Sequence, residues 1–249
     1  MWNRIKRLFI SSPDHILLMA ETENKILMQT DVRNTELYIH TQEVFNFMNS
    51  SIVDTGKNAH IFITFFSFAQ KHLMLAALSS IRRHRSQTAF NIRQASEAGA
   101  WAIFALAHPD EHGKFAKKSK NGVFEASDKL RTKMFNWLSA QYPVGSSSLK
   151  GFKERASLQS VHANIIDAWR GVKVTNEGKF SVSFFEVVDE KYYKADLWMT
   201  ANLGIGILGL VNRAVEDYPL VTLCSDFKEK YSTLERKNEE LREKTLKNI

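Results

Sequence analysis

The feature that most constrains the fold is the scarcity of residues that interrupt helices. The chain has 4 Pro and 11 Gly in 249 residues, whereas sandwiches and barrels need many turns, which are rich in both residue types. The long segments between them repeat apolar residues with helical spacing. The sequence therefore predicts an all-α fold, a helical bundle of about six or seven helices. The expected helical segments are 14–49 (one helix, or two separated near residue 30), 58–84, 86–107, 125–141, 149–165, 190–217 and the second half of 219–249.

One segment departs from the helical spacing. Residues 171–188, GVKVTNEGKFSVSFFEVV, alternate apolar and polar side chains around an Asn-Glu-Gly-Lys turn, which is a β-hairpin signal. We expect this to be the single hairpin of the chain. The predicted organisation is a bundle domain over residues 1–218 that carries the hairpin as an insertion, followed by a charged C-terminal helix over 219–249.

The composition indicates a globular protein without a membrane span. Hydrophobic residues make up 44% and charged residues 24% of the chain, which is ordinary for soluble domains. The most apolar stretch, 61–78, is interrupted by Gln70, Lys71 and His72, so we expect a buried bundle helix and no transmembrane segment. The N-terminal apolar run is too short for a signal peptide. The single cysteine, Cys224, excludes an intramolecular disulfide, and we expect a cytoplasmic protein.

The net charge of +7 and the pI near 9.4 permit contact with nucleic acid or an anionic membrane. Two basic segments are the candidate contacts with phosphate groups, namely 82–85 (RRHR) and 114–120 (KFAKKSK). The predicted nucleic-acid-binding residues are Arg82, Arg83, Arg85, Lys117, Lys118 and Lys120.

Two motifs are weaker than they look. Residues 204–209, GIGILG, match a nucleotide-binding fingerprint, but the fingerprint requires a strand before it and a helix after it. The flanking residues here read as one helix, which indicates close helix packing. Residues 108–112, HPDEH, are metal-ligand types spaced as in a solvated loop after a helix end. We therefore expect no metal site and no cofactor.

A third pattern points to chemistry. Arg155 and His162 are seven residues apart, close to two helical turns, so their side chains leave the same face of a helix. A guanidinium can stabilise charge on a phosphate, and an imidazole can move a proton. Ser157, Ser160 and Asn164 could supply further hydrogen bonds. Arg33 and His40 have the same spacing and form an alternative pair.

The Arg-x6-His pattern resembles the signature of HEPN domains, which are helical modules of prokaryotic toxins and defence proteins. The resemblance implies a homodimer with facing motifs and metal-independent RNA cleavage, as in an anti-phage effector. Residues 75–215 also loosely resemble a group of uncharacterised bacterial helical proteins, through Arg93, Glu97, Ser157 and His162, and this favours the pair at 155 and 162. We therefore expect an RNA-binding protein, with ribonuclease activity as the finer hypothesis. The alternative is a non-catalytic interaction or scaffold subunit of a larger complex.

Two further expectations concern packing. Arg93 and Glu97 are one turn apart and can pair, and the apolar helix around them indicates that the pair is partly buried. The C-terminal helix repeats residues at heptad spacing, which predicts a two-stranded parallel dimer or a protein partner at this helix. Packing against the chain's own bundle explains the same spacing equally well. The d positions are Phe227, Leu234 and Leu241, and the a positions are Tyr231, Asn238 and Thr245.

Overall fold

The computed structural model describes residues 15–28, 35–118, 121–122, 124–126, 128–160, 172–174, 178–182 and 189–246. Within these residues the fold is a helical bundle, which confirms the predicted all-α class, with eight α-helices in place of six or seven. The helices are α2 (His15–Met28), α4 (Glu36–Ser50), α5 (His60–Ile81), α6 (Arg85–Ala107), α7 (Asp128–Gln141), α8 (Pro143–Ser160), α10 (Glu190–Asp217) and α11 (Phe227–Leu246).

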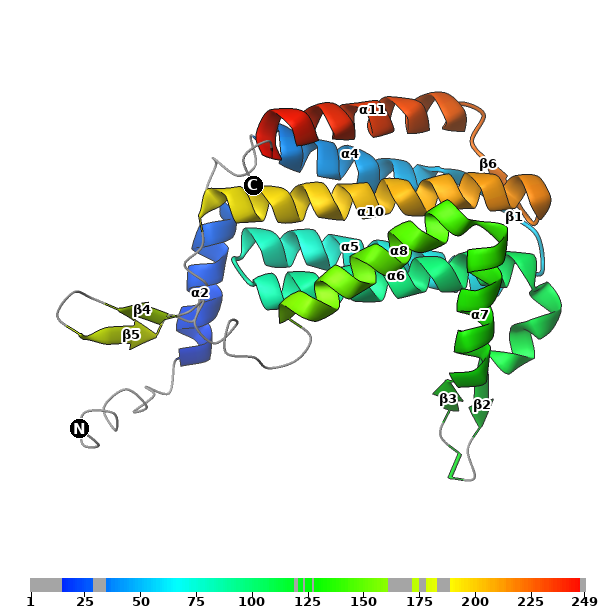
Figure 1. Ribbon diagram of the computed structural model, residues 1–249, viewed down its shortest axis with the longest axis horizontal. Coiled ribbons are helices and arrows are strands. Elements are labelled where there is room, and N and C mark those ends of the chain that lie inside the picture. The colour runs from blue at the N-terminus through cyan, green and yellow to red at the C-terminus, as the bar shows by residue number, and fades with distance from the viewer. Residues whose placement is uncertain are drawn as a thin grey trace.

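The bundle is organised around α10, which packs against α4, α5, α6, α8 and α11. In Figure 1, α4 and α11 lie on one side of α10, α5 and α6 lie on the other, and α8 crosses in front. Small residues allow this close packing. A Cβ atom on Gly204 would lie 2.9 Å from Val44 Cγ1, and one on Gly99 would lie 2.8 Å from Ile207 Cγ1. The GIGILG segment therefore serves helix packing, as its sequence context predicted.

The strands form three short antiparallel pairs. β4 (Val172–Val174) pairs with β5 (Phe180–Val182), and Gly178 in the turn has φ +71°. The predicted hairpin at 171–188 is therefore confirmed in its strands. The expectation of a single hairpin is wrong, because β2 (Ala116–Lys118) pairs with β3 (Phe124–Ala126). In addition, β1 (Ile52–Thr55) pairs with β6 (Val221–Leu223), which is far from it in the sequence.

Two segments expected to be irregular are ordered. The basic loop after α6 begins with a short 3₁₀ helix, η2 (Pro109–Lys114), and continues into β2. Residues 143–148, PVGSSS, lie between two of the expected helices, and in the structure they are the first part of α8, which begins at Pro143. Proline is favoured in the first helical turn because its missing N–H would have no partner there.

The C-terminal helix belongs to the core of the bundle. Phe227, Leu234 and Leu241, the predicted d positions, are buried in the same hydrophobic cluster as α4 and α10. Asn238, an a position, is also buried. The heptad spacing therefore describes packing within one chain, and the prediction that this face forms a dimer seam is wrong. The boundary at residue 219 does not separate two cores.

One described helix, α5, is long and apolar enough to cross a membrane by length and composition. In this structure one side of α5 packs against α6 and α10, with Phe62, Phe66 and Leu73 in the core. The other side of α5, with Phe68 and Met74, is exposed, so the helix is buried in part and not throughout as expected.

Two glycines of α10 provide a matched test of the packing. Gly204→Ala should lower the free energy of unfolding by about 1–3 kcal/mol, because the added methyl group overlaps Val44. Gly206 has no atom within 4 Å of an added Cβ, so Gly206→Ala should raise the free energy of unfolding by up to about 1 kcal/mol. Urea unfolding measures both changes, and equal effects at the two positions would contradict the packing described here.

Candidate nucleic-acid interface

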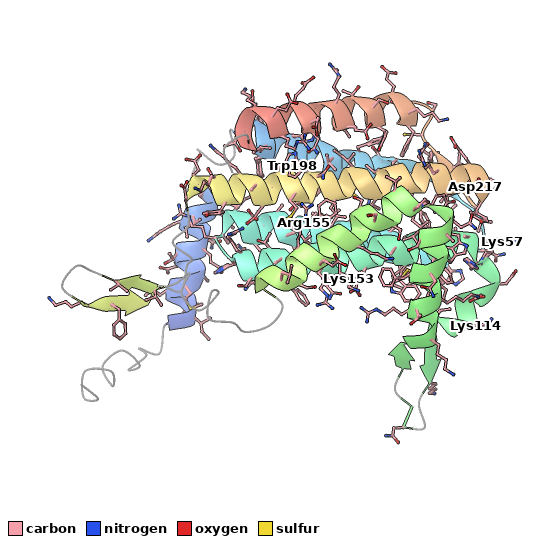
Figure 2. The ribbon with its side chains drawn as sticks, in the orientation of Figure 1. Lys57, Lys114, Lys153, Arg155, Trp198 and Asp217 are labelled. Atoms are coloured by element: carbon pink, nitrogen blue, oxygen red, sulfur yellow. The ribbon has the colours of Figure 1, made fainter. Side chains whose placement is uncertain are left out.

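Arg155 lies on the exposed side of α8. The opposite side of the helix, with Leu149, Phe152 and Ala156, is buried against the bundle, and Ser96 Oγ on α6 donates a 2.7 Å hydrogen bond to the Leu149 carbonyl oxygen. Arg155 itself is exposed and has no ion-pair partner within the described ranges. Figure 2 shows Arg155 on the edge of α8 that faces α10.

The other residues predicted to act with Arg155 are partly within and partly outside the described residues. The Ser157 hydroxyl donates a 2.7 Å hydrogen bond to the Lys153 carbonyl oxygen, one turn earlier in α8, so it is engaged with the backbone of its own helix. Ser160 is the last residue of α8. His162 and Asn164 lie outside the described residues, so the geometry of the Arg155–His162 pair is not seen here.

A groove runs beside this edge of the helix. Its volume is about 540 Å³, and it lies between α8, α10 and α11. Ser148 lines the groove, and Arg155 follows seven residues later on the same side of α8. Burial and the nearby Glu235 carboxylate raise the pKa of Tyr231 to about 12, so its phenol stays neutral. The lining combines apolar groups, neutral hydrogen-bonding groups and charged side chains, among them Ser148, Phe152, Asn202, Tyr231, Arg213, Glu235 and Glu239.

The alternative pair, Arg33 and His40, is not supported by the structure. Arg33 lies outside the described residues, and the His40 side chain is 0% exposed. His40 Nε2 lies 3.2 Å from Asn238 Oδ1, inside the interface between α4 and α11. A bound RNA cannot reach this imidazole, so His40 as a catalytic group is corrected to a core residue.

His40 belongs to a buried polar network that holds α11 in place. The Asn238 amide nitrogen donates to Asn202 Oδ1 at 3.0 Å, and the Asn238 carbonyl oxygen accepts a bond from Trp198 Nε1 at 3.0 Å. His40 Nδ1 is buried without a hydrogen-bond partner among the described residues, 3.6 Å from a Glu43 oxygen. The network therefore orders α4, α10 and α11 relative to one another.

The basic segment 82–85 is largely engaged within the chain. Arg82 pairs with Glu23 of α2 at 3.7 Å. Arg85 pairs with the buried Asp196 of α10 at 3.1 Å and stacks over Tyr192. Arg85 is therefore a structural residue, which corrects its assignment as a nucleic-acid contact. Arg83 is exposed, in a left-handed backbone conformation with φ 63° that ends the turn between α5 and α6.

The lysines of segment 114–120 lie on or near the β2–β3 hairpin. Lys118 is exposed on β2. Lys117 is in the same strand, with its side chain outside the described part of the structure, and Lys120 lies outside the described residues. Their predicted role in nucleic-acid binding stays a prediction.

A third group of cations was not predicted in full. Arg93 Nε lies 3.5 Å from Glu97 Oε1, and both side chains are partly buried, as expected. The same oxygen also accepts from Arg131 Nη2 of α7 at 3.0 Å and lies 3.1 Å from Lys153 Nζ of α8. We call these four residues the Glu97 cluster. Only the density of basic residues in KGFKER hinted at Lys153, and nothing in the sequence linked Arg131 to this carboxylate.

Among the described side chains, which do not include that of His112 in the HPDEH segment, no group of three His, Cys, Asp or Glu converges. His108 stacks on Phe104 and lies 3.0 Å from the carbonyl oxygen of that residue. Glu111 is partly buried and pairs with Lys133 of α7.

Comparisons of this chain with protein-family models, curated proteins and solved structures found no match.

The buried histidine gives a testable pH dependence. Burial, with a smaller contribution from the Lys237 charge, lowers the pKa of His40 below its usual value of 6.5. Below pH 6.5 the unfolded chain therefore binds a proton that the folded chain excludes, and stability is lost as the pH falls. The free energy of unfolding should decrease by up to about 1.4 kcal/mol per pH unit from this group alone.

The measurement is urea unfolding at a series of pH values below neutrality. His40→Gln should remove this part of the pH dependence, because an amide does not titrate there. His60→Gln, at an exposed position on α5, should retain it. An unchanged pH dependence in the His40 variant would contradict the assignment.

Proposed function

We propose that this chain binds RNA along α8 and cleaves it without a metal ion, with Arg155 and His162 as the acting pair. The observation that carries the proposal is the position of Arg155, which is exposed on the edge of α8 beside a groove of about 540 Å³. Arg82 and Arg85 are instead paired with carboxylates. Arg155 has no acidic partner among the described residues, and its guanidinium can bind a phosphate group through two parallel N–H bonds.

The chemistry follows from the two side chains. The Arg155 guanidinium stabilises the charge that develops on the phosphate during attack by the adjacent 2′-hydroxyl. His162 takes the proton from that hydroxyl or gives one to the leaving oxygen. The neighbouring groove has the Tyr231 ring and the Asn202 amide on its wall, which suit stacking and hydrogen bonding to an unpaired base. Single-stranded RNA is therefore the proposed substrate, and a defence effector is the role that the HEPN resemblance implies.

We propose a second copy of the chain as the partner, through the outer face of α8 and not through α11. Val144 and Leu158 are 80% and 83% exposed, and they lie two heptads apart on nearly the same side of the helix as Arg155. Exposed apolar side chains that share a face of a helix can form a contact with another protein. A dimer formed there would bring the two Arg155 side chains toward each other.

The second candidate function is a non-catalytic subunit of a larger complex. The exposed Val144 and Leu158 also favour it, because another protein could cover the same face. The two functions differ in one property. A non-catalytic subunit leaves RNA intact whether or not it binds it.

The cleavage assay uses a fluorescently labelled single-stranded RNA and the full-length chain. We expect cleavage that persists in the presence of a chelator. His162→Ala and Arg155→Ala should each reduce the cleavage rate by about 100-fold or more, since each removes a group that acts on the transition state. Thermal unfolding of both variants should match the wild type.

Arg236→Ala is the matched control, because it removes the same charge from the exposed side of α11. It should cleave like the wild type. Full activity of the His162 variant would reject the catalytic pair. RNA binding without cleavage by the wild-type chain would favour the non-catalytic candidate.

The dimer prediction is tested by light scattering at micromolar protein concentration. The wild-type chain should have the mass of a dimer, and Leu158→Asp should have the mass of a monomer, because the buried contact would carry an unpaired charge. Val53→Asp changes another exposed apolar residue, on β1, and should remain dimeric. A monomeric wild-type chain would exclude this interface.

A further inference from the structure

We propose that the Glu97 cluster is a binding site for a phosphate group, on the edge of α8 opposite to Arg155. The site uses none of the residues proposed for cleavage, so it stands apart from the ribonuclease proposal. Lys153 and Arg155 are two residues apart on α8, which turns their side chains to opposite edges of the helix. Figure 2 shows Lys153 on the edge away from α10.

The first argument is the charge balance of the cluster. Arg93, Arg131 and Lys153 come from three different helices, and all three contact one carboxylate oxygen, Oε1 of Glu97. Three positive charges on one negative charge leave two uncompensated. Among the described residues these cations have no second acidic partner, and Glu154, the acidic neighbour on α8, is exposed and forms no ion pair with them.

The second argument is partial burial, which makes the excess charge matter. The side chains of Arg93, Lys153 and Glu97 are 25%, 24% and 18% exposed, and that of Arg131 is 41% exposed. Like charges held together away from bulk water repel one another more strongly than on an open surface. A bound anion relieves this repulsion, because it supplies the missing negative charge.

The third argument is the supply of hydrogen-bond donors. A guanidinium has five N–H donors and a lysine ammonium has three. Arg93 uses Nε and Arg131 uses Nη2 toward Glu97, and the other donors of both side chains have no partner among the described residues. The Lys153 ammonium also lies 4.7 Å from the centre of the Phe135 ring on α7, and this cation–π contact helps to hold its position. Lys150, one turn earlier on α8, donates to Ser139 Oγ of α7 at 2.8 Å and forms no ion pair with Glu97.

A tetrahedral oxyanion fits these requirements. Its several oxygens can accept from Arg131 and Lys153 together, whereas a carboxylate or chloride would satisfy fewer donors. The phosphate group could belong to an RNA backbone or to a small phosphorylated molecule. Both sources present the same chemistry to the cluster, and the experiment separates them.

The first arm of the experiment measures thermal unfolding in inorganic phosphate and in chloride at equal ionic strength. Phosphate at several times its Kd should raise the Tm of the wild-type chain by about 2–4 °C. The double variant Arg131→Met with Lys153→Met keeps the apolar stems and should lose this shift. Any shift left in the double variant measures the general stabilising effect of phosphate salts.

Glu97→Gln distinguishes a binding site from a purely structural ion-pair network. It removes the only negative charge of the cluster and keeps the shape of the side chain. A binding site predicts a larger phosphate-dependent shift of Tm in this variant than in the wild type. An equal phosphate shift in the wild type and in the double variant would overturn the proposal.

The second arm identifies the source of the phosphate. Fluorescence anisotropy measures the binding of a labelled single-stranded RNA to the wild type and to Lys153→Met. An RNA backbone at the cluster predicts about tenfold weaker binding and a smaller salt dependence in the variant. Unchanged RNA binding together with an intact wild-type phosphate shift assigns the site to a small phosphorylated molecule.

Discussion

The close approach of α10 to its neighbours is the constraint on which the rest of the structure depends. At Gly204 there is no room for a methyl group beside Val44, so α4 and α10 pack with their backbones near each other. Polar contacts then attach α6, α8 and α11 to the same element. Asp196 binds Arg85 at the start of α6, Asn202 binds Asn238 of α11, and Asp217 accepts a hydrogen bond from Tyr142 just before α8. The Tyr142–Asp217 bond holds the start of α8, the helix that carries Arg155, against the end of α10.

The packing of α11 shows how one sequence pattern serves two structures. A heptad repeat with a buried asparagine describes a parallel dimer, and it equally describes a helix that lies along the groove between two others. Here Asn238 finds its partners in His40 and Asn202 of the same chain. The periodicity fixes which side of a helix is buried, but it does not identify what buries it.

The helices and the β4–β5 hairpin could be predicted because their signals are local: apolar spacing, and a Gly178 turn between alternating strands. The β1–β6 pair could not be predicted, because the fold brings Ile52 and Leu223 together from distant parts of the sequence. Each segment is also too short to show the alternating pattern of a strand. The Glu97 cluster likewise has a part that could be predicted and a part that could not. The pairing of Arg93 with Glu97 follows from one helical turn, whereas the arrival of Arg131 and Lys153 at that carboxylate depends on how α6, α7 and α8 pack.

α8 is the element that connects these observations to function, because Arg155 lies on one of its edges and Lys153 on the other. The most direct test is photo-crosslinking of the full chain to single-stranded RNA that contains 4-thiouridine, with the crosslinked peptides mapped by mass spectrometry. An RNA-binding surface on α8 predicts crosslinks within residues 143–160 and in the groove-lining part of α10. Crosslinks confined to residues 82–85 or to the exposed side of α11, or none above the level of a non-binding control protein, would contradict it.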